Sequence, residues 1–216
     1  MYFAGIFPFF LNLYSYSALT YDIILIMKTV SEYVQEAVDL MESGSYEFAL
    51  VPTVAAIGET IRKTSGKEDL SEYDFQEFIK ANWQLITFMG MPRALPLPLN
   101  IPFGVKRIVP TFNVHHGAEE IVLLVIAQIL RTGRLPEEFA FNTAGEFEIK
   151  DGKLLLPDSL IYGLLGGVIF HPTNKDEITP DKYWLSVADF KMFISEFWGR
   201  QDLAERIMKF YLEREA

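Results

Sequence analysis

The chain has 216 residues, half of them hydrophobic, and its 29 acidic residues outnumber 19 basic ones, which gives a formal net charge of −10. This length is sufficient for one domain with a hydrophobic core of its own. The negative charge, and the lack of a basic run interleaved with aromatic residues, argue against a nucleic-acid-binding surface. Because the sequence contains no cysteine, disulfides, zinc–thiolate sites and a cysteine nucleophile are excluded. The composition fits a reducing cytoplasm, and cytoplasmic is the localisation that we expect.

Residues 1–26 differ in composition from the rest of the chain. They contain eight aromatic residues and a single charged residue, Asp22. Three interpretations are open: a start set too early, with Met27 as the true start; a membrane anchor; or a packed segment. No lysine or arginine precedes Lys28, which argues against a secretory signal peptide. We treat residues 27–216 as a single globular domain, and we expect no membrane contact unless residues 1–26 are a real anchor.

Residues 27–133 carry the period of amphipathic helices and form the helical part of the domain. A capping box at residues 29–32 begins a first helix. Gly44 and Ser45 connect it to a second helix, so that the two form an antiparallel hairpin, and a third helix is expected from Ser71 to Gly90. Residues 91–110 contain five prolines interleaved with large apolar residues. We expect an extended segment packed across the helices there, with a proline-rich ligand for a partner as the alternative.

The stretch Gly117–Gly133 is apolar on nearly every side when it is read as a helix. Glu119 and Glu120 in its first turn and Arg131 in its last turn suit the helix dipole. At about 1.5 Å per residue it is too short for a membrane span, which needs roughly 20 apolar residues. A helix that is hydrophobic all round must be surrounded. We therefore expect this stretch to be the buried central helix of the domain.

Residues 134–216 combine hairpins with helices. A hairpin is expected around Asp151 and Gly152, because this pair suits a type I′ turn with positive φ at both central residues. A second hairpin is expected within residues 183–194. Three glycines in the helix predicted at residues 160–170 indicate the close approach of another backbone, such as that of the central helix. The sequence therefore predicts an α+β fold: a mainly helical bundle around a buried central helix, with a small antiparallel sheet from two hairpins in the C-terminal third.

The three histidines of the chain are His115, His116 and His171. His115 and Glu119 are four residues apart, so they share a face on a continuing helix. With His171, or alternatively Asp176, from the later loop, they form a candidate metal site; His115, Glu119 and His171 give two histidines and one carboxylate, as in metal-dependent hydrolases. The alternative is structural, with His115 and His116 capping the helix start or packing under the proline-rich segment. No cofactor is predicted.

The segments 40–50 and 55–62 resemble the helical start of HEPN domains, which are small bacterial and archaeal helical bundles, many of them ribonuclease toxins or defence components. The resemblance implies metal-independent RNA cleavage, in which an arginine holds the phosphate and a histidine moves a proton. The usual motif is an arginine, four to six residues and a histidine, whereas seven residues separate Arg107 from His115 here. The catalytic residues that the resemblance implies are Arg107, His115 and His116.

Trp198 and Arg200 flank Gly199 and are candidates for a binding corner, with the packing of Trp198 under the last helix as the alternative. No glycine-rich phosphate loop, nucleophile elbow or dinucleotide fingerprint occurs. Our leading hypothesis is therefore an intracellular helical protein that acts through protein association, with a protein partner or as a homo-oligomer such as a homodimer. A HEPN-like ribonuclease or defence component and a metal-dependent hydrolase are the alternatives, so enzymatic activity stays open.

Overall fold

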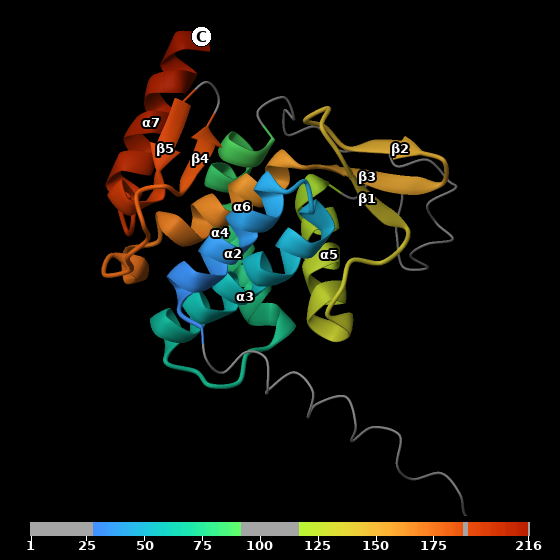
Figure 1. Ribbon diagram of the computed structural model, residues 1–216, viewed down its shortest axis with the longest axis horizontal. Coiled ribbons are helices and arrows are strands. Elements are labelled where there is room, and N and C mark those ends of the chain that lie inside the picture. Colours follow the sequence, from blue (N-terminus) through green and yellow to red (C-terminus); the bar gives the residue numbers. More distant parts are fainter. Residues whose placement is uncertain (1–27, 92–116, 188–189, 216) are drawn as a thin grey trace, which may run out of the picture.

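The computed structural model describes residues 28–91, 117–187 and 190–215 of the chain. Helices dominate these residues, and the described strands all follow α5 in the chain (Figure 1). The main elements are α2 (Val30–Glu42), α3 (Tyr46–Ser65), α4 (Glu72–Gly90), α5 (Ala118–Thr132), β1 (Phe139–Asn142), β2 (Glu148–Lys150), β3 (Lys153–Pro157), α6 (Ser159–Ile169), β4 (Trp184–Val187), β5 (Phe190–Phe193) and α7 (Gln201–Glu215). The predictions about residues 1–26, the start at Met27 and the proline-rich segment at 92–110 lie outside the described residues.

The hairpin of α2 and α3 forms as the sequence predicts. The Thr29 hydroxyl accepts a hydrogen bond from the Glu32 N–H at 3.2 Å, and the Glu32 carboxylate accepts one from the Thr29 N–H at 2.7 Å, which completes the capping box. Gly44, at a φ of 75°, lets the chain turn towards α3. One side of α2 packs against α3, while the opposite side carries Glu36 and Asp39 at the surface.

Of the described helices, α6 is the most completely buried, and it takes the central place that the sequence suggested for Gly117–Gly133. Nine of its 11 residues are buried, and it packs against α4 and α3. Helix α5 ends as predicted at Gly133, with a φ of 70°. However, only five of its 15 residues are buried, and it lies along one side of the bundle in Figure 1. The choice of α5 as the central helix is therefore wrong, because an apolar sequence does not specify which of two apolar helices the others surround.

The close packing of α6 depends on Gly163. A Cβ placed on Gly163 would lie 2.3 Å from the Ile86 carbonyl oxygen and 3.0 Å from the Gly90 Cα, both in α4. The Ser159 hydroxyl at the start of α6 also donates to the Gly90 carbonyl oxygen at 2.6 Å. The predicted approach of another backbone is therefore confirmed, but the approaching helix is α4 rather than α5.

Both predicted hairpins form. Strands β2 and β3 pair antiparallel on either side of Asp151 and Gly152, whose φ values of 50° and 76° fit the type I′ turn. Strand β1 was not expected, and it pairs parallel with β3 to give a three-stranded sheet of order β1-β3-β2. Strands β4 and β5 form a separate antiparallel pair. The fold class is α+β and mainly helical, as predicted.

The C-terminal hairpin and α7 lie at the opposite end of the molecule from the three-stranded sheet (Figure 1). The Gly199 N–H donates to the Ile169 carbonyl oxygen at 2.8 Å, which attaches the corner before α7 to the end of α6. Tyr183, just before β4, is buried and reaches α2. No helix in the described part of the chain is long and apolar enough to cross a membrane.

Candidate functional site

The predicted catalytic residues Arg107, His115 and His116 lie outside the described residues. The HEPN-like ribonuclease therefore stays a prediction. The segments that carry the resemblance, 40–50 and 55–62, lie in the α2–α3 hairpin. That hairpin contains no histidine, because His115 is the first histidine of the chain. The catalytic histidine that the resemblance implies therefore has to come from outside the hairpin.

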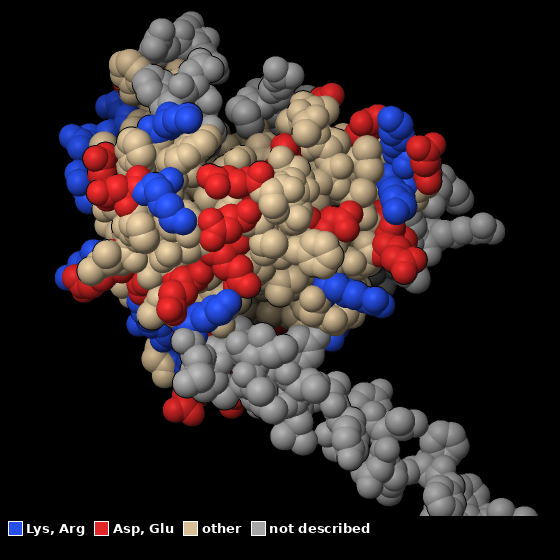
Figure 2. Space-filling model, in the orientation of Figure 1, with Lys and Arg blue, Asp and Glu red and all other residues tan. Residues whose placement is uncertain are grey.

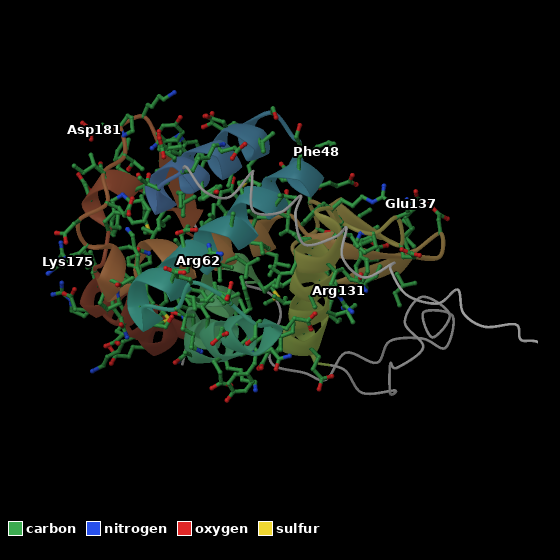
Figure 3. All side chains as sticks on the ribbon, turned by 90° about the horizontal axis from the view of Figure 1, so that it is seen from below. Phe48, Arg62, Arg131, Glu137, Lys175 and Asp181 are labelled. Atoms are coloured by element: carbon green, nitrogen blue, oxygen red, sulfur yellow. The ribbon has the colours of Figure 1, made fainter. Side chains whose placement is uncertain are left out.

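The described members of the predicted metal site do not come together. Glu119 is in the first turn of α5, whereas His171 follows α6 and its ring stacks on Phe78 of α4, with 5.8 Å between ring centroids. Figures 1 and 3 show α5 on the opposite side of the bundle from the turn after α6, where Lys175 is labelled. Within the described ranges, no group of three histidine, aspartate or glutamate residues is placed to hold a metal ion. A site that includes both Glu119 and His171 is therefore not formed, and His115 lies outside the described residues.

His171 has a local role in the turn that follows α6. Its Nδ1 accepts a hydrogen bond from the Thr173 N–H at 3.4 Å, at the start of the 3₁₀ turn η2 (Pro172–Asn174). Burial lowers the pKa of the imidazole below its ordinary value of 6.5, because the protonated ring loses hydration. The ring is therefore neutral at pH 7, as an accepting Nδ1 requires.

Burial separates the two members of the candidate binding corner. Trp198 is only 5% exposed, and its Nε1–H donates to the Thr179 hydroxyl at 3.3 Å. Arg200 is exposed, and its Nε lies 3.5 Å from an Asp202 carboxylate oxygen. The indole thus belongs to the core of the C-terminal end, and Arg200 is the member that a partner would meet at the surface.

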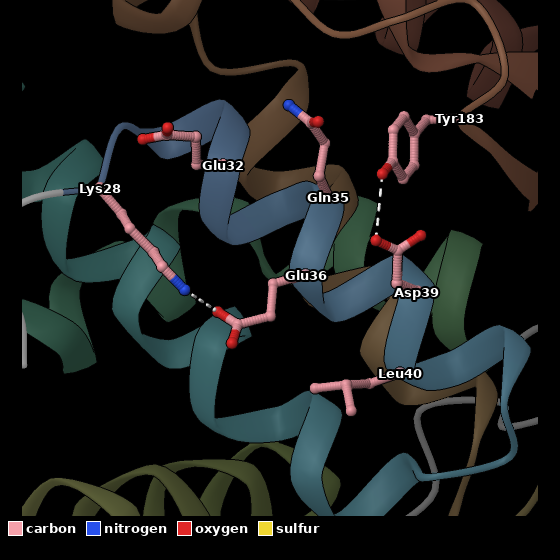
Figure 4. A pocket seen from close by; sticks show the side chains of 7 residues that line it. All are labelled: Lys28, Glu32, Gln35, Glu36, Asp39, Leu40 and Tyr183. Carbon is pink, nitrogen blue, oxygen red and sulfur yellow. Dashed lines mark hydrogen bonds and ion pairs between the residues drawn. The ribbon is translucent and has the colours of Figure 1, made fainter.

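An open groove of about 490 Å³ runs along the outer side of α2 (Figure 4). It is lined by Lys28, Glu32, Gln35, Glu36, Asp39, Leu40 and Tyr183. The Tyr183 hydroxyl donates to an Asp39 carboxylate oxygen at 3.0 Å, and the Lys28 ammonium lies 2.9 Å from a Glu36 carboxylate oxygen. Because Tyr183 directly precedes β4, the groove lies between α2 and the start of the C-terminal hairpin. We call these seven residues the acidic groove.

The acidic groove is part of a strongly negative surface. Residues 28–48 contain five acidic residues and a single lysine, and Figure 2 shows acidic side chains in a row across the face that α2 forms. Glu32, Glu36 and Asp39 follow one another at spacings of four and three residues, so helix geometry places them on one side of α2. A positively charged group that approaches this row meets several carboxylates within two helical turns.

An apolar strip lies on α3, the helix that packs against α2. Phe48, in the first turn of α3, is 68% exposed. Val51 and Ala55 follow it on the same side of the helix and are partly exposed. Figure 3 shows Phe48 at the rim of the molecule, and Figure 2 shows uncharged surface beside the acidic row. We call the acidic groove together with Phe48, Val51 and Ala55 the α2–α3 face.

The start of α3, which carries Phe48, is held by contacts to β1 and α6. The Tyr46 ring lies 6.1 Å from the Phe141 ring of β1, measured between centroids. Burial and the nearby Asp158 carboxylate raise the pKa of the Tyr46 phenol above 10.0, so the phenol is uncharged at neutral pH. The exposure of Phe48 is therefore not the result of a loose helix end, because its neighbour in the same turn is packed.

The α2–α3 face combines charged, hydrogen-bonding and apolar groups. It offers carboxylates, one amide, one phenol and apolar carbon, and its lysine is already paired with Glu36. Sequence reasoning missed this face because surface helices ordinarily carry acidic residues. The available signal was the spacing of Glu32, Glu36 and Asp39, whereas the exposure of Phe48 depends on how α3 packs.

Comparisons with known proteins give one family. The model of a family described as Rv1289 matches residues 29–215. The uncharacterized protein Rv1289 of Mycobacterium tuberculosis (strain H37Rv) is 52% identical over 52 residues, which are 24% of this chain and 25% of that protein. The uncharacterized protein Mb1320 of Mycobacterium bovis matches to the same extent. The alignment thus spans about a quarter of the length of these curated relatives. No solved structure matches significantly.

Proposed function

The chain belongs to the Rv1289 family, and we propose that it acts through protein association, with the α2–α3 face as its docking surface. The observation that supports this proposal most directly is the 68% exposure of Phe48 beside the acidic groove. Full burial of a phenylalanine side chain stabilises a protein or a complex by about 1.5–3 kcal/mol. A partner that covers the exposed part of Phe48 gains most of this contribution, since the side chain is 68% exposed in the chain alone.

The arrangement of the α2–α3 face resembles the anatomy of protein interfaces in general. Such interfaces place aromatic anchors at the centre and polar groups at the rim, and a few anchors carry most of the binding energy. Here Phe48 is the aromatic anchor, Val51 and Ala55 extend the apolar centre, and the carboxylates of α2 form the rim on one side. We place this association inside the cell, consistent with a cysteine-free composition.

Site-specific photo-cross-linking in a mycobacterial host tests the proposal. The photoreactive residue p-benzoylphenylalanine replaces Phe48 in the full chain, and the same residue replaces Tyr73 in a matched control. Tyr73 is an aromatic residue of α4 that is 63% exposed but lies outside the α2–α3 face. We expect a discrete adduct from position 48 and a much weaker yield from position 73, because only the former contacts a partner.

The mass of the adduct identifies the kind of association. A product of twice the chain mass indicates a homo-oligomer, and any other discrete mass indicates a different protein, which mass spectrometry then identifies. Equal yields from positions 48 and 73, or no adduct at position 48, would contradict the assignment of this face as the docking surface.

A further inference from the structure

We propose that the partner presents a cationic amphipathic helix to the α2–α3 face. This inference rests on the proposed function, and it names the chemistry of the partner at that same face. Two features of the face carry it: a row of carboxylates on α2 and a parallel apolar strip on the neighbouring helix α3.

The carboxylate row sets the charge of the partner. Glu32 and Asp39 are seven positions apart in α2, with Glu36 between them, which is about 10 Å along the helix axis. Lysine or arginine residues at positions i, i+4 and i+7 of a second helix repeat with the same spacing, so each can meet one carboxylate. Lys28 is the basic residue of the acidic groove, and it already pairs with Glu36 at 2.9 Å. Lys182, beside Tyr183, interacts electrostatically with Asp39 and Glu42. These two lysines oppose the five acidic residues of 28–48, so the face keeps an excess of negative charge.

The apolar strip sets the shape of the partner. Phe48 and Ala55 are also seven positions apart, with Val51 between them, on the helix that packs against α2. Two adjacent rows of similar length, one acidic and one apolar, are complementary to a helix with a basic stripe beside an aliphatic stripe. This is the helix-in-groove mode of recognition, which uses anchors at i, i+3, i+4 and i+7. An extended strand would direct alternate side chains away from the face and would use only half of them.

The charge of the face argues against a second copy as the occupant. A two-fold dimer places the same patch on both sides of its interface. Pairing two α2–α3 faces would bring the carboxylates of Glu32, Glu36 and Asp39 against their own copies, and like charges oppose each other across an interface. An anionic lipid surface is disfavoured for the same reason. A basic helical segment of another protein is the occupant that the charge favours.

Peptide binding to the full chain tests the chemistry of the partner. Three fluorescein-labelled peptides of about 18 residues, or five helical turns, are compared by fluorescence anisotropy at low salt. The first is an amphipathic helix of leucine and lysine, the second has the same composition in scrambled order, and the third is an amphipathic helix of leucine and glutamate. We expect the first to bind at least about tenfold more tightly than the second, a difference of about 1.4 kcal/mol, and the third not to bind.

Variants of the face locate the binding site. Phe48→Ser should weaken binding of the leucine–lysine peptide by about tenfold, while Tyr73→Ser should leave it unchanged. Glu32→Gln combined with Asp39→Asn should weaken it at low salt, and the difference should vanish near 1 M salt, where the Debye length is about 3 Å. Both amides keep the acceptor oxygens that bond Thr29 N–H and the Tyr183 hydroxyl. Glu77→Gln on α4 is the charge control, and circular dichroism with thermal melting verifies that each variant is folded.

The outcomes separate this inference from the proposed function. Equal binding of the ordered and scrambled peptides would reduce the interaction to net charge and overturn the inference, as would unchanged binding to Phe48→Ser. A discrete cross-link at position 48 together with no binding of the leucine–lysine peptide leaves the association in place and rejects a cationic helix as the partner. Absence of the cross-link rejects the docking surface itself, whatever the peptides do.

Discussion

At the scale of single residues, Asn174 holds the turn after α6 to two neighbouring elements. Its side chain is fully buried, and its Nδ2 donates to the Thr60 hydroxyl at 2.9 Å and to the Val168 carbonyl oxygen at 2.8 Å. Its Oδ1 has no hydrogen-bond partner in the described structure. Buried polar groups cost free energy unless they are paired. An amide suits this position because its Nδ2 group donates both of these hydrogen bonds.

Replacing this amide tests that account. Asn174→Ala should lower the free energy of unfolding by about 2 kcal/mol, because it removes two buried side-chain hydrogen bonds, to the Thr60 hydroxyl and the Val168 carbonyl oxygen. Asn174→Asp should cost more, since it turns a donor towards two oxygens into another acceptor and buries a charge. Urea unfolding followed by circular dichroism gives both values. A change below about 0.5 kcal/mol for Asn174→Ala, the range of ordinary surface substitutions, would contradict this role.

Glu177 is a second residue that ties distant parts together, and it makes stability depend on pH. Its carboxylate accepts a hydrogen bond from the Ser31 N–H at 2.9 Å, in the first turn of α2, and pairs with Lys63 of α3. Burial by itself raises the pKa of this carboxyl, but the bonds from Lys63 and Ser31 outweigh burial, and the pKa is lowered from 4.5. A carboxyl with a lowered pKa stabilises the fold above its unfolded pKa, and this contribution is lost as pH falls through the folded pKa.

The corresponding variant is Glu177→Gln. At pH 7 it should be less stable than the native chain by about 2 kcal/mol, because the amide cannot replace a charged acceptor for Lys63 and the helix N-terminus. The difference should shrink as the pH falls below 4.5, where the native carboxyl becomes protonated as well. Urea titrations at a series of pH values measure it. A difference that is constant between pH 7 and pH 3 would show that charge plays no part.

At the scale of elements, α4 and α6 pack at the centre of the bundle, and at Gly163 their backbones touch directly. The carbonyl oxygen of Ile86 lies only 2.3 Å from the position that a Cβ on Gly163 would take. Gly167, one turn further along α6, is different: the nearest atom to a Cβ there is the Asn82 Cβ at 3.4 Å. A side chain at Gly163 would therefore clash with the α4 backbone, whereas the nearest atoms to one at Gly167 belong to side chains of α4.

Alanine at these two glycines gives a matched pair. Gly163→Ala should destabilise the protein by about 3 kcal/mol, because the added methyl group forces α4 and α6 apart. Gly167→Ala should be close to neutral or slightly stabilising, since alanine favours the helix by up to about 1 kcal/mol and the space nearly suffices. Thermal melting of both variants tests this. Equal effects at the two positions would contradict the contact between α4 and α6.

At the scale of the whole molecule, the bundle separates α5 from the turn that contains His171. Glu119 belongs to α5, whereas His171 lies in the turn after α6 and packs on the Phe78 ring. That turn and α5 are on opposite sides of the bundle (Figure 1). A single metal ion binds its ligands at roughly 2.0–2.3 Å. One ion therefore cannot reach both Glu119 and His171 in this fold.

Metal titration examines this separation directly. His171→Ala should leave any shift in melting temperature on addition of Zn²⁺ the same as in the native chain, because the imidazole is remote from Glu119. His115→Ala is the comparison variant, since His115 and Glu119 remain a predicted pair of ligands four residues apart. A zinc-dependent shift that disappears in His171→Ala would show that these residues do come together.

Local patterns in the sequence predicted the elements well. The capping box at Thr29, the turn at Asp151 and Gly152 and the C-terminal Gly133 of α5 all depend on residues within a few positions of one another. Such short-range chemistry has the same consequence wherever the segment lies. Strand β1 was missed because Phe139–Asn142 has four residues without clear alternation, and its pairing partner β3 lies further along the chain.

The sequence by itself determined the helical hairpin, the two β-hairpins, the α+β class and the strongly negative charge of residues 28–48, because periodicity, capping and turn chemistry are local. Only the tertiary structure decided that α6 rather than α5 is central, that Gly163 meets α4, and that Phe48 stays exposed beside the carboxylates of α2. These outcomes depend on which apolar surfaces find each other across long chain separations. An apolar side chain favours burial, but the sequence does not specify which neighbour buries it or whether a partner protein does so.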